Sequence, residues 1–154
     1  MNHKEIIVQL QSQSTWFLFF INVFTLGIYC GHYIIRQTRV INSHVGHHQP
    51  ISFVFVLLIV VLKYAFVLGF VLNYFYPAIK GLFLTHVLLD LFIHASVIVW
   101  GVQARNRMNR ILNVTSSHFS YFGLLGSVMF SPFYLNYKVN MSHEKLIEQY
   151  AVGA

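Results

Sequence analysis

Long runs of apolar residues alternate with short polar connections along this chain. Two of the runs, residues 15–35 and 118–137, contain no Asp, Glu, Lys or Arg, while Lys63 stands inside a third run and Asp90 inside a fourth. A helix needs roughly 20 residues to cross the hydrocarbon core of a bilayer. The pattern therefore predicts an all-α integral membrane protein with about four transmembrane helices, near residues 15–35, 51–76, 81–101 and 118–137.

The connections predict how these helices are joined. Pro77 and Gly81 bracket so short a connection that the second and third helices must form an antiparallel hairpin. Pro132 removes a backbone hydrogen bond inside the fourth run and should kink that helix. Residues 142–150 begin with Ser142 as an N-cap and then alternate charged and apolar positions, which predicts a short amphipathic helix on the membrane surface.

Composition supports the membrane class and argues against a soluble enzyme. Hydrophobic residues make up 56% of the 154 residues and charged residues 9%, so that a single transmembrane domain uses most of the chain. The lone cysteine, Cys30, excludes an internal disulfide. The sequence also has no glycine-rich phosphate loop and no second membrane carboxylate beside Asp90. We therefore expect no catalytic residues, no enzyme activity and no cofactor.

The distribution of cations predicts the orientation and the partners. The formal net charge of +6 resides mostly in connections, where lipid headgroups explain it better than nucleic acid. The arginines fall in the two connections on one predicted face: Arg36, Arg39, Arg105, Arg107 and Arg110. The lysines outside the spans fall on the other face: Lys4, Lys80, Lys138 and Lys145. The positive-inside rule then predicts an inner (plasma) membrane protein with cytoplasmic arginine connections and both termini outside.

Two short motifs resemble those of a bacterial protein family. Residues 25–29 read TLGIY and lead into an aromatic, basic stretch, and residues 130–140 read FSPFYLNYKVN. In both features the chain resembles a family of small bacterial multi-pass membrane proteins that is classified as a domain of unknown function. Many of its members carry a tryptophan shortly after the TLGIY tyrosine, where this chain has His32 and Tyr33. The resemblance implies a bacterial membrane protein and assigns no chemistry.

The third run contains the sharpest candidate site. His86, Asp90 and His94 recur at intervals of four residues and therefore form one polar stripe on a helix. A carboxylate near the middle of a bilayer costs at least roughly 2.5 kcal/mol on insertion scales, so Asp90 should have a partner. Counting residues along the predicted hairpin places Lys63 at the depth of His94. We expect an intramembrane cluster of Lys63, Asp90 and His94, with His86 one turn away.

This cluster has three interpretations. The polar groups can fix which helices pack together, within one subunit or between subunits. They can instead form a proton or cation path, for which titratable groups one turn apart are suited. A bound cofactor is the third interpretation.

Other histidines offer weaker candidates for a metal or haem site. His44, His47 and His48 have a spacing that can supply imidazoles to a transition metal, but the loop offers neither cysteine nor carboxylate, and a solvated polar loop is the plainer interpretation. Haem ligation between helices needs one histidine from each of two facing helices, for which His32 and His118 are the available pair.

Gly27 and Gly31 form a GxxxG motif in the first run, which suits either close packing within the bundle or a homo-oligomer interface. Together these features predict an oligomer-forming or accessory membrane subunit with a structural polar cluster. The first alternative is a small proton or cation channel that uses the same residues. The second alternative is a haem- or metal-binding membrane protein.

Overall fold

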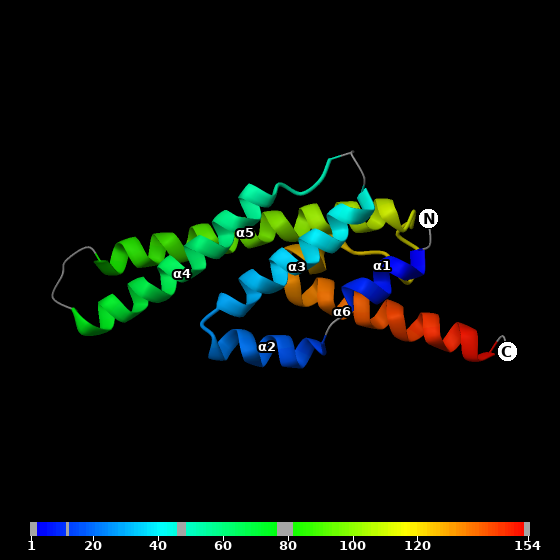
Figure 1. Ribbon diagram of the computed structural model, residues 1–154, viewed down its shortest axis with the longest axis horizontal. Helices are drawn as coiled ribbons and strands as arrows, with labels where there is room; N and C mark the ends of the chain where they lie inside the picture. The colour runs from blue at the N-terminus through cyan, green and yellow to red at the C-terminus, as the bar shows by residue number, and fades with distance from the viewer. Residues whose placement is uncertain (1–2, 12, 46–48, 77–81, 153–154) are drawn as a thin grey trace.

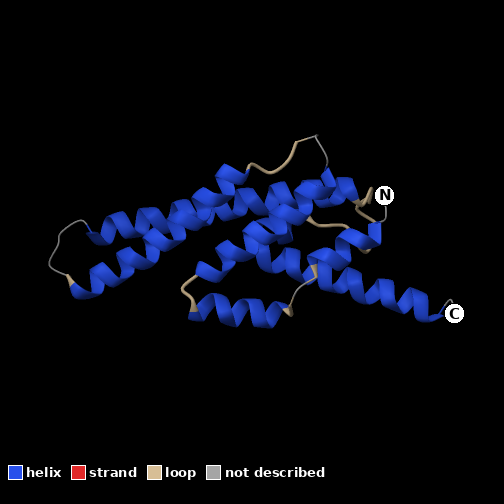
Figure 2. Cartoon of the chain, viewed as in Figure 1, coloured by secondary structure: helices blue, strands red, loops and turns tan. Residues whose placement is uncertain are grey.

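A computed structural model describes residues 3–11, 13–45, 49–76 and 82–152. The described residues form helices and no strand, which confirms the predicted all-α class (Figure 2). In chain order the helices are α1 (His3–Leu10), α2 (Thr15–Phe24), α3 (Ile28–Val45), α4 (Phe53–Phe75), α5 (Leu82–Ile111) and α6 (Leu124–Val152).

Two helices, α4 and α5, are long and apolar enough to cross a membrane. They correspond to the second and third predicted spans and run side by side in opposite directions (Figure 1). Of the most apolar 18-residue stretch of each helix, 17% of the residues are buried within the chain. Their apolar side chains thus point outward, unlike those of a core helix in a soluble domain. The connection 77–81 lies outside the described residues.

The predicted first span is broken in two. α2 ends at Phe24 and α3 begins at Ile28, and α3 folds back along α2 (Figure 1). At the turn, Leu26 and Gly27 adopt positive φ values of 49° and 87°. Thr25 Oγ1 then accepts a hydrogen bond from Tyr29 N at 3.1 Å and caps the new helix. The expectation of one continuous helix over residues 15–35 is wrong, because the TLGIY motif forms a turn that reverses the direction of the chain between two helices.

The predicted fourth span is broken as well. α6 begins only at Leu124, and the expected kink at Pro132 is a full interruption, since Ser131 has φ 35° and ψ −108°. The two halves of α6 pack together, because the ring of Tyr134 lies against Gly126 and its hydroxyl accepts a hydrogen bond at 2.9 Å from N of Gly123, the residue before α6. The second half continues to Val152 and includes the predicted tail helix 142–150. Ser142 is therefore not an N-cap but a fully buried residue within the helix.

The packed core lies at one end of the molecule. There α1 packs against α3 and α6, and the second half of α5 packs against α6. The indole nitrogen of the buried Trp100 donates to Thr38 Oγ1 at 2.9 Å and joins α5 to α3. The largest fully buried apolar side chains form this core: Trp100, Phe122, Ile6, Ile7, Leu10, Leu18, Ile34, Ile41, Ile51, Ile59 and Met108.

α1 and the C-terminal half of α6 lie at this core end (Figure 1). The arginines lie in helices, in α3 and α5, and not in connections as predicted. Arg107 donates to the backbone oxygen of Gln49 at 2.8 Å, and Arg105 donates to the backbone oxygen of Phe122 at 3.0 Å. Lys138 donates to the backbone oxygen of Phe119 at 2.6 Å, in the same connection that Arg105 holds. The separation of arginines and C-terminal lysines onto opposite faces is therefore not seen, because both broken helices reverse direction.

Candidate functional site: a cavity between the broken helices

Two adjoining cavities lie between α2, α4, α5 and α6. The larger has a volume of about 830 Å³ and reaches from α2 and α4 to the interruption of α6. The smaller has a volume of about 330 Å³ and lies beside the turn between α2 and α3. Asn22, Lys63, Ile93 and His94 line both cavities, and Asp90 lines the smaller one. Three members of the predicted cluster thus border one cavity system.

Lys63 enters this region through the space that two glycines leave open. A Cβ built on Gly31 would lie 3.4 Å from Lys63 Cδ, and one built on Gly27 would lie 3.1 Å from Lys63 Nζ. The GxxxG motif therefore faces α4 of its own chain. In the part of the chain that the structure describes, Lys63 makes no hydrogen bond and no ion pair. The expected contact between Lys63 and Asp90 is absent, although both line the smaller cavity.

Asp90 instead pairs within its own helix. His94 Nδ1 lies 3.2 Å from Asp90 Oδ1 and 2.9 Å from the Asp90 backbone oxygen. The two side chains are 41% and 70% exposed for Asp90 and His94 respectively. Residues four apart on a helix are neighbours, so that this contact requires no second helix. The contact with His94 provides a partner for one oxygen of the Asp90 carboxylate, and both side chains remain accessible from the cavities.

His86 is separate from the two cavities. Its ring stacks on Phe66 with centroids 4.3 Å apart, and a Cβ built on Gly69 would lie 3.0 Å from His86 Nδ1. That nitrogen is buried and has no hydrogen-bond partner within the described residues. The structure thus places His86 in the α4–α5 contact and not among the cavity-lining residues.

The remaining histidines are dispersed. His32 Nε2 lies 2.9 Å from the Tyr64 hydroxyl, whereas His118 stacks on Phe119 in the connection before α6. His44 Nδ1 lies 2.9 Å from the backbone oxygen of Val40 in its own helix. His47 and His48 lie outside the described residues. Within the described ranges, no group of three or more His, Cys, Asp or Glu side chains is placed to hold a metal ion.

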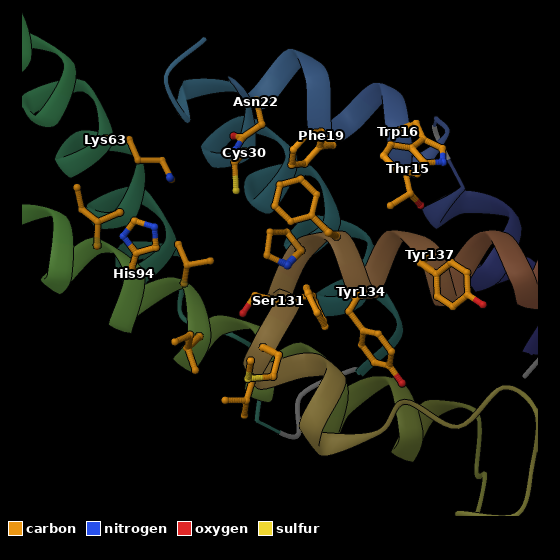
Figure 3. Close-up of a pocket in the computed structure, with 18 residues that line it drawn as sticks. Thr15, Trp16, Phe19, Asn22, Cys30, Lys63, His94, Ser131, Tyr134 and Tyr137 are labelled. Atoms are coloured by element: carbon orange, nitrogen blue, oxygen red, sulfur yellow. The ribbon is translucent and has the colours of Figure 1, made fainter. Parts of the chain in front are cut away.

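The wall of the larger cavity is mostly aromatic and aliphatic. Lys63 and His94 lie at one end, Trp16 and Tyr137 lie toward the other, and Phe19 lies between them (Figure 3). Asn22 contributes a buried Oδ1 that has no hydrogen-bond partner among the described residues. Sequence reasoning missed Asn22 and the aromatic wall, because two broken helices bring together residues that a four-span bundle would keep apart.

A second polar centre joins the two sequence motifs. The Tyr29 hydroxyl of TLGIY donates to Gln13 Oε1 at 2.8 Å. From the closing segment, Asn136 and Asn140 each donate through Nδ2 to the backbone oxygen of Gln13 at 3.0 Å. The two motifs therefore hold the connection between α1 and α2 from both sides.

Lys138 lies in the same closing segment. Burial and, secondly, the nearby charge of Lys145 lower the pKa of Lys138. Its amine therefore gives up its proton more readily than that of a free lysine, and its donation to Phe119 persists in either protonation state.

Comparison of the chain with protein-family models, curated proteins and solved structures found no match. The resemblance to the TLGIY family remains a prediction.

Proposed function

We propose that this protein is a non-catalytic, oligomer-forming or accessory membrane subunit. The α4–α5 hairpin crosses the bilayer, and its outward-facing apolar side chains support this assignment. α2 has 10 residues and a length of about 15 Å, which is about half of the hydrocarbon core. Trp16 and Phe24 of α2 are 73% and 84% exposed. We infer that α2 and the first half of α6 enter the bilayer part of the way.

This arrangement changes the proposed orientation. α1 and the C-terminal half of α6 share the core end with the arginines of α3 and α5, and the positive-inside rule makes that end cytoplasmic. The protein would then lie in a bacterial inner membrane with α1 and the second half of α6 at the cytoplasmic surface. Arg36, Arg39, Arg105, Arg107 and Arg110 would contact acidic headgroups there.

The Asp90–His94 pair carries the structural interpretation of the polar cluster. His94 Nδ1 lies 3.2 Å from Asp90 Oδ1 within α5, and Lys63 of α4 extends along Gly31 of α3 and along Gly27 of the turn before it. The contacts of Lys63 pack α4 against α3, whereas the Asp90–His94 contact stays within one helix. The pair is nevertheless substantially exposed on a helix that faces lipid, where charged groups need cover. We propose that a second copy of the chain, or a partner subunit, supplies this cover.

A conducting path finds less support. Between the cluster and the arginine end lie Ile34 on α3, Ile59 on α4 and Trp100 on α5, all fully buried. An ion or a proton wire needs a continuous row of polar groups or water, and these apolar side chains interrupt it. We therefore infer that no polar path connects the cluster with the cytoplasmic side.

Mass measurement in nanodiscs and proton flux in liposomes test this function together. We expect a wild-type oligomer that Asp90→Leu weakens, with no proton flux above that of empty liposomes. Glu144→Gln, which alters an exposed carboxylate of α6, is the matched control and should leave the mass unchanged. A monomer in nanodiscs would contradict the homo-oligomer and leave a partner subunit as the source of the cover. A proton flux that Asp90→Asn abolishes would replace it with the channel.

A further inference from the structure

The larger cavity combines one unpaired cation with a long apolar wall. Lys63 has no hydrogen bond or ion pair among the described residues, although it lies inside an apolar helix. An unmatched charge in a membrane interior is costly, so a negatively charged group that pairs with Lys63 gains more than it would in water.

The rest of the cavity matches an aliphatic chain. From Lys63 the wall continues past Phe19 to Trp16 and Tyr137 (Figure 3), and most of the side chains that line it are apolar. The volume of about 830 Å³ falls within the usual range of small-molecule sites. Met129 and Phe130, which line the cavity where α6 is interrupted, are both 63% exposed. A membrane-dissolved ligand can therefore enter sideways from the lipid.

We propose that this cavity binds a long-chain carboxylate, with the carboxylate at Lys63 and the aliphatic chain along the aromatic wall. Among the residues that line the larger cavity, Lys63 carries the formal positive charge, and it can pair with the single negative charge of a carboxylate. His94, already engaged by Asp90, is a second donor at the same end when protonated. The proposal requires the membrane location alone and does not depend on the oligomeric state.

Binding of a spin-labelled hexadecanoic acid to the protein in phosphatidylcholine nanodiscs tests this site. Wild type should bind the acid saturably, and unlabelled hexadecanoate should displace it, whereas hexadecanol should not. Lys63→Gln should weaken binding by about tenfold or more, since a charge-assisted hydrogen bond is lost. Lys145→Gln, which removes an exposed cation of α6 outside the cavity, should leave binding unchanged.

A pair of filling variants tests the apolar wall. Ile98→Trp places a large ring in the cavity and should abolish binding, whereas Val99→Trp adds the same ring at the next residue, which does not line it. Equal displacement by hexadecanol and hexadecanoate on the wild-type protein would overturn the proposal even if a variant fails to fold. Displacement by phosphatidylglycerol at equal potency would overturn the assignment to a free carboxylate.

Discussion

The amine of Lys63 lies against Gly27, where α2 turns into α3. A Cβ at Gly27 would lie 3.1 Å from Lys63 Nζ, and the φ of Gly27 is 87°. The backbone conformation of the turn therefore favours glycine, and a side chain there would also make the lysine amine shift by a few tenths of an ångström. The turn between α2 and α3 is therefore part of the site, because Lys63 and Gly27 both line the smaller cavity.

Gly27→Ala should accordingly destabilise the fold by roughly 1 to 3 kcal/mol, the cost of a side chain in a left-handed conformation. The measurement is the unfolding midpoint of the purified protein in detergent. Leu26→Gly is the matched control, since Leu26 already has a positive φ of 49°. It should leave the midpoint unchanged or raise it. Equal losses in both variants would show that the turn is not strained as described.

The connection between the two motifs predicts a coupling through Gln13. Tyr29→Phe removes the hydrogen bond from the tyrosine hydroxyl to Gln13 Oε1, and Gln13→Ala removes its acceptor. A double-mutant cycle in detergent should give a coupling of about 0.5 to 1.5 kcal/mol. Gln13→Ala retains the backbone oxygen to which Asn136 donates, so that it should not couple to Asn136→Ala. Additive effects of Tyr29→Phe and Gln13→Ala would mean that the bond contributes nothing.

The apolar runs of the sequence predict the helical class and the two long helices, and the short connection between Pro77 and Gly81 predicts the α4–α5 hairpin. The interruptions between α2 and α3 and within α6 are harder to predict from the sequence. The TLGIY segment contains no charged residue, and hydropathy carries no information on the φ of Leu26 and Gly27. Pro132 predicts a kink, yet the full interruption also depends on Gly101 of α5, where a Cβ would lie 2.9 Å from Ser131 Oγ.

The candidate site was also predictable only in part. Counting residues along the hairpin brings Lys63 and His94 to one depth, and both line the cavities. The ion-pair partner of Asp90 was not predictable in this way, because the i, i+4 contact with His94 competes with any contact across helices. Asn22 and Trp16 join the site only because α2 is a separate helix.

The interruption of α6 predicts a specific effect at Tyr134. Its hydroxyl accepts a hydrogen bond from Gly123 N at 2.9 Å and joins the two halves of the helix. Tyr134→Phe should lower the stability in detergent by about 0.5 to 1.5 kcal/mol, since the amide of Gly123 loses its acceptor. Tyr137→Phe is the control, because that side chain is 53% exposed. A larger loss for Tyr137→Phe would contradict the packing of the two halves.

The most direct test of the fold in the membrane is the sidedness of three positions. In a Cys30→Ser background, single cysteines at Glu148 in α6, Ser116 before α6 and Tyr76 at the end of α4 would be labelled with an impermeant reagent in intact cells. Two crossings with two broken helices predict that positions 148 and 116 are both protected and that position 76 reacts. Labelling of 148 together with 76, with 116 protected, would contradict this account and restore four continuous spans.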